Sequence, residues 1–365
     1  MKNVLCERMT PRSTEPETIE RRELSATATR AVREAACRIA ATLDGMSGRS
    51  AHTAVTLTDP ELITLVDSHA AQLPESVGEA LRAPATAAGA AVIGGLPVSD
   101  DDLGPTPGNW QQAAAWAGDP DRRRDSFELD LAMLLLARSA GEPFGWQGQQ
   151  DGRLVNNIVP APGHEDEQSG ASSTTLLTPH TEDAFHPRRA HLLLLGCLRN
   201  HDRVGTTLSS VREVRLDDGQ RGRLNEPALP ILPDVSYGTD FHEYPTAPIA
   251  TVGGEPDRPT LRYDPAYTPL DEADPEFRSA YDHLGAELER VCRTAVLAPG
   301  ELLLMDNDVV VHGRVPFTAR YDGADRWLKR VNIRLPRARP PAESGETGYG
   351  QVTVTPFDTE AVAAH

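Results

Sequence analysis

The sequence has few cysteines and lacks long apolar runs. Its 365 residues include four cysteines, which are Cys6, Cys37, Cys197 and Cys292. They lie far apart and form no CxxC or zinc-type spacing, so we expect reduced thiols rather than disulfides or a structural zinc site. No apolar run approaches the roughly 20 residues of a membrane span, and the N-terminus shows no apolar signal core. These absences predict a cytoplasmic protein without a membrane partner.

Basic residues are also scarce. Lys and Arg together number 36, against 54 Asp and Glu, which gives a formal net charge of -18. A nucleic-acid-binding protein needs a basic face for the phosphates, so this class of partner is excluded, and an anionic membrane surface is equally unsuited. An acidic surface suits a cationic substrate, but more often it only keeps a protein soluble. The charge does not decide whether the chain forms a homo-oligomer.

Helical patterns dominate the first part of the chain, after a polar segment at residues 1–17 that predicts a flexible tail. The residue patterns predict helices at 18–43, 60–71, 74–81 and 126–140, and one strand at 90–97. Short apolar runs separated by Gly, Pro and Asp follow, which indicates an antiparallel β-fold rather than βαβ units. These strand candidates include residues 190–198, 294–297, 302–305 and 329–335.

One helix is predicted among the later strands. Asp274 would cap it and Pro275 suits its first turn. The pattern as a whole predicts a mixed α/β fold with a mainly β core, in which helices cover an antiparallel sandwich or barrel. We expect a single domain over residues 18–345, with a β core at about 144–336 and a C-terminal tail at 346–365. The segment 237–258 is either a lid over the site or a surface loop.

Two His-x-acid motifs are candidates for a metal site. Ferrous oxygenases use two imidazoles and one carboxylate on one face of the ion, and residues i and i+2 of a strand point the same way. His164 lies in a Gly-, Pro- and acid-rich loop, whereas His180 and Glu182 directly precede an apolar strand. We therefore favour His180 and Glu182, which would lie at the mouth of a sheet.

A distant histidine supplies the third ligand of this hypothesis. His312 ends an apolar strand and is followed by two arginines, Arg326 and Arg330. A guanidinium there would bind the distal carboxylate of 2-oxoglutarate in a bidentate manner. Taken singly, each of these residues is more simply an ordinary surface or core residue, and their combination makes the metal site the better interpretation.

Three segments resemble a known family. HTEDAFHPRRAHLLLLGCLRN at 180–200, GTTL at 205–208 and VHGRVPFTARYDGADRWLKRVNI at 311–333 resemble the clavaminate synthase-like Fe(II)/2-oxoglutarate oxygenases. Within them the similarity is greatest to hydroxylases of free amino acids in peptide-antibiotic pathways, in particular the viomycin-pathway L-arginine β-hydroxylase group. The resemblance extends from about residue 144 to 336. It implies a double-stranded β-helix, or jelly roll, flanked by N-terminal and inserted helices.

The resemblance also implies roles for individual residues. The metal ligands would be His180, Glu182 and His312, and Arg326 would bind the co-substrate with help from Thr206 or Thr207, of which we favour Thr207. The implied cofactors are Fe(II), 2-oxoglutarate and O₂, and the partner is a small amino acid. The substrate contacts would come from Gln149, Glu182, Asp234, Ser236, Asp264 and Arg330.

One position departs from the pattern of the arginine hydroxylase. That group has an Asp-x-Asp pair that holds the guanidinium, and here Asp264 is followed by Ala266 in the second position. A planar guanidinium is best held by two carboxylates, so the loss of the second one argues against linear arginine. Asp234 and Asp264 still suit a cationic substrate. The substrate is therefore expected to be either arginine or a bulkier cyclised derivative such as enduracididine or capreomycidine. For Asp234 and Asp264 a role in turns is an equal alternative.

Other functions remain open from the sequence. They are oxygenation of another amino acid such as asparagine or a carrier-tethered residue, desaturation, a non-enzymatic jelly-roll binding protein, and a zinc hydrolase that uses the same three ligands. A zinc hydrolase would act without O₂, and a binding protein would form no succinate. Hydroxylation in this group is usually at Cβ, which we take as the expected position.

Overall fold

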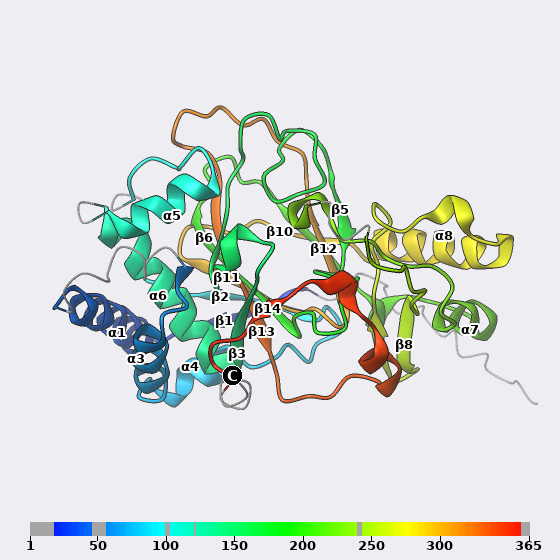
Figure 1. Ribbon diagram of the computed structural model, residues 1–365, viewed down its shortest axis with the longest axis horizontal. Helices are drawn as coiled ribbons and strands as arrows, with labels where there is room; N and C mark the ends of the chain where they lie inside the picture. The colour runs from blue at the N-terminus through cyan, green and yellow to red at the C-terminus, as the bar shows by residue number, and fades with distance from the viewer. Residues whose placement is uncertain (1–17, 46–55, 99–102, 120–121, 239–242, 359–365) are drawn as a thin grey trace, which may run out of the picture.

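A computed structural model describes residues 18–45, 56–98, 103–119, 122–238 and 243–358 (Figure 1). The predicted tail at 1–17 and Cys6 therefore lie outside the described residues. Cys37, Cys197 and Cys292 are thiols, as predicted. Among the described helices, none combines the length and the apolar character that a membrane crossing requires.

A large sheet forms the centre of the molecule. Its order is β1 (Glu20–Glu23), β2 (Ala90–Gly94), β11 (Glu301–Asp306), β6 (Leu192–Arg199), β13 (Trp327–Arg334), β3 (Glu142–Trp146) and β14 (Thr353–Val354), with β4 (Asn156–Ile158) also pairing with β13. Only the β1–β2 pair is parallel. The antiparallel arrangement predicted for the later strands is therefore confirmed.

A smaller sheet carries the sequence motifs of the site. Its order is β10 (Arg293–Ala295), β7 (Thr206–Ser210), β12 (Val310–Arg314) and β5 (Leu177–His180). The two sheets share one apolar core, which includes Leu193 and Leu195 of β6 and Val311 of β12. The smaller sheet thus covers one face of the large sheet.

The other face of the large sheet is covered by helices. Leu192 and Leu194 of β6 alternate with the residues of the shared core and pack instead with helix α6 (Arg123–Ala140). Both faces of β6 are buried, which explains why its sequence is a continuous apolar run. The remaining helices of this layer are α1 (Ala26–Gly45), α3 (Pro60–Ala70), α4 (Glu75–Ala80) and α5 (Trp110–Gly118), whereas α7 (Asp218–Asn225) and α8 (Pro275–Arg290) lie at the opposite end (Figure 1).

Most predicted elements are present, with two kinds of difference. The helix predicted at 18–43 was placed too early, because residues 20–23 form β1 and the helix begins at Ala26, where the Ser25 hydroxyl accepts a hydrogen bond from the backbone N–H of Ala28. Helices α5 and α7 were not predicted. The predicted cap of α8 is confirmed, since Asp274 accepts hydrogen bonds from two backbone N–H groups of the first turn.

The C-terminal segment returns to the body of the protein, which corrects the boundary expected at 345. Strand β14 pairs with β3, and Tyr349 and Phe357 are buried. Glu346 forms an ion pair of 2.7 Å with Arg262. Residues 346–358 are therefore part of the folded structure and not a tail, because pairing with a distant strand edge holds them.

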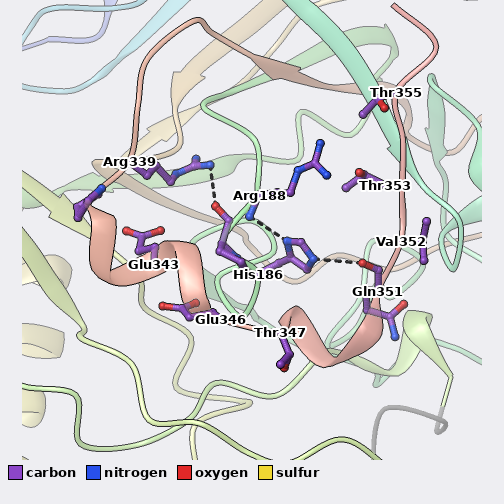
Figure 2. A pocket seen from close by; sticks show the side chains of 12 residues that line it. His186, Arg188, Arg339, Glu343, Glu346, Thr347, Gln351, Val352, Thr353 and Thr355 are labelled. Carbon is purple, nitrogen blue, oxygen red and sulfur yellow. Dashed lines mark hydrogen bonds between the residues drawn. The ribbon is translucent and has the colours of Figure 1, made fainter. Parts of the chain in front are cut away.

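A cavity of about 660 Å³ lies between this segment and residues 186–188 (Figure 2). His186 closes one side of it and donates through Nε2 to the Gln351 carbonyl at 3.2 Å, while its Nδ1 accepts from the Arg188 N–H at 2.9 Å. Burial, supported by the charges of Arg334 and Arg188, lowers the pKa of His186 to about 3. A neutral imidazole thus joins the C-terminal segment to the body.

We expect His186 to make the stability of the protein depend on pH. As the pH falls below the unfolded pKa of 6.5, the unfolded chain binds a proton that the folded imidazole excludes until about pH 3. The free energy of unfolding should therefore decrease over this window, by at most about 1.4 kcal/mol per pH unit for this residue. His186→Gln should show a smaller decrease in urea titrations between pH 6.5 and 4. The exposed His164→Asn is the control, and equal slopes in all three proteins would contradict the prediction.

Close contact between helix α6 and β6 depends on Gly196. A Cβ atom at this position would lie 2.5 Å from Met133 Sδ, and Met133 is fully buried. We expect Gly196→Ala to lower the free energy of unfolding by about 1–3 kcal/mol through overpacking.

Met133→Ala should make room for the added methyl group, so the double variant should be less destabilised than the sum of the two single variants. Gly222→Ala is the control, because a Cβ atom added to Gly222 of α7 would have no atom within 4 Å and alanine is favoured in helices. Additive effects in denaturant titrations would show that the two side chains do not compete for the same space.

Candidate metal centre

The structure brings His180, Glu182 and His312 together from remote parts of the chain. His180 ends β5, His312 lies in β12, and the two residues are directly paired across the strands. Glu182 Oε2 lies 3.8 Å from His180 Nε2 and 3.4 Å from His312 Nε2. Among the described residues this is the only group of three or more His, Cys, Asp or Glu side chains that could hold a metal ion. His164 instead lies on the surface, where it contacts Glu167.

The ligand nitrogens have the orientation that a metal ion requires. The Nδ1–H group of His180 donates to the Thr178 carbonyl at 2.8 Å, which leaves Nε2 directed at Glu182. Burial would lower the pKa of His180, but Glu182 and Asp264 outweigh it and raise this pKa to about 9. Burial and the charge of His180 lower the pKa of His312 to about 3. The carboxylate of Glu182 beside two imidazoles therefore makes a site that suits a divalent ion, whose binding requires neutral histidines.

The backbone of Glu182 is fixed by Asn307. The Asn307 side chain accepts from the Glu182 N–H at 2.9 Å and donates to the Glu182 carbonyl at 3.0 Å. Arg330 forms an ion pair with the other carboxylate oxygen, Oε1. Despite burial, Arg330 and the two histidines hold the pKa of Glu182 well below its usual value. Glu182 is thus an ionised carboxylate at neutral pH, as a candidate metal ligand must be.

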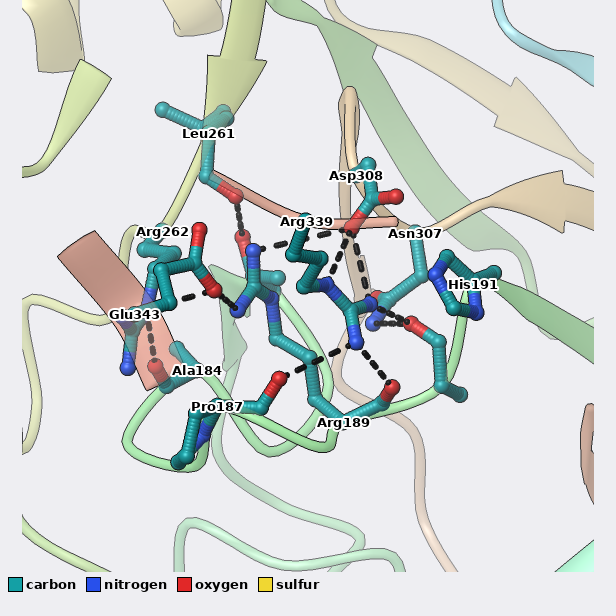
Figure 3. Close-up of polar contacts among 12 residues, drawn as sticks. Ala184, Pro187, Arg189, His191, Leu261, Arg262, Asn307, Asp308, Arg339 and Glu343 are labelled. Carbon is teal, nitrogen blue, oxygen red and sulfur yellow. Dashed lines mark hydrogen bonds and ion pairs between the residues drawn. The ribbon is translucent and has the colours of Figure 1, made fainter. Parts of the chain in front are cut away.

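An arginine cluster holds Asn307 in place (Figure 3). The adjacent Asp308 accepts hydrogen bonds from Arg337 at 2.6 Å and from Arg339 at 2.9 Å. These guanidinium groups and that of Arg189 outweigh burial and lower the pKa of Asp308 to about 2. Arg339 also donates to the carbonyl of residue 190, to which Asn307 donates as well. The turn between β11 and β12 is therefore attached to the chain that follows Glu182.

Arg326 and its neighbours fit a bound carboxylate. Arg326 is buried and donates to the Thr206 hydroxyl at 3.1 Å. Among the described residues, neither Arg326 Nε nor the buried Thr207 hydroxyl has a hydrogen-bond partner. Buried polar groups rarely stay unsatisfied, so these two atoms are available for a ligand. The structure thus places Arg326 beside the threonine pair, and the prediction that Thr207 helps to bind the co-substrate stays a prediction.

The residues predicted to contact the amino acid form a chain of contacts from the metal site. Arg330 Nη2 donates to Gln149 Oε1 at 2.8 Å and to Asn156 Oδ1 at 3.0 Å. Gln149 in turn donates to the Ser236 hydroxyl at 3.3 Å. The line from Glu182 through Arg330 and Gln149 thus reaches the segment that contains Asp234.

Asp234 and Asp264 lie near this line and near each other, and Asp264 also lies near His180, whose pKa it helps to raise. Each accepts backbone hydrogen bonds through Oδ1, from Ser236 for Asp234 and from Ala266 and Tyr267 for Asp264. The turn role that was their alternative interpretation is therefore observed. Burial raises the pKa of both carboxyl groups, that of Asp264 to about 6, and the charge of Asp234 contributes to the rise at Asp264. A cation between them would relieve this repulsion.

Several residues of the site were not predicted from the sequence. Asn307 and Asn156 lie in turns or short strands, where asparagine is common for other reasons. Asp183, which has a positive φ of 52°, accepts hydrogen bonds from Trp146 Nε1 at 2.6 Å and from the Tyr237 hydroxyl. The polar HTED sequence and the positive-φ preference of Asp were the only signals for it.

Comparison with known proteins agrees with this geometry. The sequence profile of the taurine catabolism dioxygenase TauD, TfdA family matches residues 131–332. Enduracididine beta-hydroxylase of Streptomyces hygroscopicus is 38% identical over 73% of this chain and 83% of its own length. Clavaminate synthase 2 of Streptomyces clavuligerus is 34% identical over 73% of this chain and 82% of its own.

A solved structure is similar over most of the chain. The non-heme iron oxygenase OrfP in complex with Fe, succinate and (3R,4R)-dihydroxy-L-Arg superimposes with a TM-score of 0.72 at 36% identity, covering 86% of this chain and 93% of OrfP. The donor set of two imidazoles and one carboxylate suits ferrous iron with open coordination positions, and the Arg326 region suits the carboxylate of 2-oxoglutarate. The chain belongs to the TauD/TfdA family and is an Fe(II)- and 2-oxoglutarate-dependent dioxygenase.

Proposed function

We propose that this dioxygenase hydroxylates Cβ of a free amino acid that carries a guanidino group, in peptide-antibiotic biosynthesis. The substrate would be arginine or a cyclised derivative such as enduracididine or capreomycidine. The observation that carries the proposal is that the buried guanidinium of Arg330, which contacts Glu182 and Gln149, and the two buried carboxyl groups of Asp234 and Asp264 lie around the same metal site. The enduracididine and arginine chemistry of the related proteins supports the same substrate class.

Arg330 is suited to the substrate α-carboxylate. Three of its N–H groups are used by Glu182, Gln149 and Asn156, and Nε has no partner among the described residues. A guanidinium has five donors in a fixed plane, so part of it stays available for a carboxylate. The substrate amine would then lie near Glu182, and its side chain would extend towards Asp234 and Asp264.

The carboxylate end of the site favours a cationic side chain. Asp234 and Asp264 use Oδ1 for turn hydrogen bonds, which leaves Oδ2 of each for a guanidinium. Ala266, which occupies the second position of the Asp-x-Asp pair, carries no carboxylate and is exposed. We propose that the space beside Ala266 accommodates the ring of a cyclised guanidine.

Each group of this chain would have a separate task in the reaction. Ferrous iron and 2-oxoglutarate, when bound, supply the oxygen chemistry that converts a C–H bond into C–OH. His180, Glu182 and His312 would hold the metal, and Arg326 with Thr206 or Thr207 would orient the co-substrate. Arg330, Gln149, Asp234, Ser236 and Asp264 would hold the amino acid so that Cβ faces the metal.

We also propose the finer points of architecture and location. The sandwich of a large and a small antiparallel sheet supports a jelly-roll core, and the covering helices support one domain that extends at least to residue 358. The reduced cysteines support a cytoplasmic location. Oxygenation of asparagine remains the second candidate, and it would leave the carboxylates Asp234 and Asp264 without a cation.

Metal binding should require His312 and not His164. His312→Ala should abolish hydroxylation and remove the stabilisation of the protein by added Fe(II) under anaerobic conditions, because it removes one of three ligands. For wild type, a free metal concentration 100 times the Kd should increase the free energy of unfolding by about 2.7 kcal/mol. His164→Ala should match wild type in both measurements. Retention of metal-dependent stabilisation by His312→Ala would disprove the ligand set.

A panel of free amino acids tests the substrate class. With Fe(II), 2-oxoglutarate and O₂, mass spectrometry should detect the addition of one oxygen to L-arginine or a cyclic guanidino amino acid, and not to asparagine. Asp264→Asn should raise the KM for the guanidino substrate at least about tenfold, because hydrogen bonds to charged groups contribute about 1.5–3 kcal/mol.

Ala266→Asp is the matched variant for ring size. It should restore the pair of carboxylates and shift the ratio of kcat/KM values towards linear arginine. Hydroxylation of asparagine alone, with no product from any guanidino amino acid, would refute the proposed substrate class.

A further inference from the structure

A charged cluster is enclosed between helix α6 and the large sheet. Asp130 of α6 accepts a hydrogen bond from Lys329 Nζ at 2.5 Å and another from Arg153 Nη2 at 2.7 Å. All three side chains have 0% exposure to solvent. Removal of charges from water costs free energy that pairing only partly offsets, so stability alone explains such a cluster poorly.

Lys329 and Arg330 connect this cluster with the amino-acid site. Successive side chains of a strand point to opposite faces, so Lys329 of β13 faces α6 while Arg330 faces Glu182. Gly196 of β6 is paired with Lys329 of β13. Because glycine has no side chain, α6 can approach the sheet closely enough for Asp130 to reach Lys329. The cluster and the site thus share one strand.

The same cluster also holds the loop that surrounds Arg330. Arg153 belongs to this loop, and Asn157 Oδ1 accepts from Lys329 Nζ at 3.0 Å and from Trp327 Nε1 at 3.1 Å. Gln150 and the backbone of Asn157 exchange two hydrogen bonds of 2.9 Å. The same loop contains Gln149 and Asn156. Each of them accepts a hydrogen bond from Arg330 Nη2.

We infer that Asp130, Lys329 and Arg153 are positioning residues for the amino-acid substrate. They hold the loop 149–157 on β13, so that Gln149 and Asn156 fix the plane of the Arg330 guanidinium and leave its remaining donors directed at the substrate carboxylate. The inference rests on the proposed function, in which Arg330 receives that carboxylate. The co-substrate should be unaffected, because the contact of Arg326 with Thr206 involves no residue of this loop.

Lys329→Met is the variant that tests this role. It removes one cation and leaves Asp130 paired one-to-one with Arg153, so the remaining buried charges stay balanced. Arg138→Met is the matched control, because it removes another ion pair of α6, the partly exposed contact with Asp67. Arg330→Lys is the reference for direct loss of the guanidinium.

The experiment measures both the affinity for the amino acid and how strictly co-substrate consumption is coupled to hydroxylation. Anaerobic titration of the holoenzyme with L-arginine and with L-enduracididine gives the Kd of each, and turnover assays give the KM for the co-substrate and the ratio of succinate formed to amino acid hydroxylated. For Lys329→Met we expect a Kd weakened roughly 10- to 100-fold and a raised succinate ratio, because small displacements of positioning groups have effects of this size. The KM for the co-substrate should stay within about twofold of wild type, and Arg138→Met should match wild type throughout.

The outcomes separate the inference from the proposed function. If Lys329→Met only unfolds at a lower temperature, with Kd and succinate ratio unchanged at a temperature where it is folded, the cluster is merely structural and the inference is wrong. If Arg330→Lys binds the amino acid as wild type does, the proposed role of Arg330 is wrong. If neither probe binds wild type, the substrate class is wrong, and the effect of Lys329→Met is then measured with the amino acid of the panel that is hydroxylated.

Discussion

The carboxylate of Glu182 connects the metal centre with the amino-acid site. Its Oε2 atom faces both imidazoles, and its Oε1 atom is paired with Arg330. In the proposed function, this one residue would set the position of the metal relative to the guanidinium that is proposed to bind the substrate. The Asn307 side chain is hydrogen-bonded to the backbone of Glu182. The next residue, Asp308, is held by the arginine cluster (Figure 3). The rest of the site depends on this single carboxylate.

The two-layer cover of the large sheet explains where functional residues occur. All of β6 and most of β13 is buried, so apolar side chains are expected at most of their positions. Lys329 and Arg330 are exceptions in β13, and each meets a specific set of oxygen atoms instead of solvent. Because burying a charge costs free energy unless the charge is paired, the partners of these two residues are informative.

Charge is also arranged along the site. Arg326 and Arg330 supply positive charge where the two small-molecule carboxylates are proposed to lie, and Asp234 and Asp264 supply negative charge nearby. A zwitterionic amino acid with a cationic side chain would complement both kinds of charge. The protein therefore contributes orientation, and the reactive chemistry belongs to iron and 2-oxoglutarate.

Local sequence was sufficient for the parts that depend on neighbouring residues. Asp274 and Pro275 predicted the start of α8, and an apolar strand beside His180-Thr181-Glu182 distinguished this motif from the loop that contains His164. The distant His312 was found because it follows an apolar run at residues 309–311, near the end of a predicted strand. Its convergence with the motif follows from the pairing of β5 with β12.

Other features were decided only by tertiary structure. Nothing near Lys329 in the sequence indicates that its partner is Asp130, and nothing near residue 346 indicates that β14 pairs with β3. The contact of Arg326 with Thr206, and the ion pair between Arg330 and Glu182, likewise join residues more than a hundred positions apart. Sequence by itself determined the candidate metal ligands, because ligand type and strand context are local properties. The tertiary structure decided which charges meet, because partner choice depends on how distant strands and helices pack.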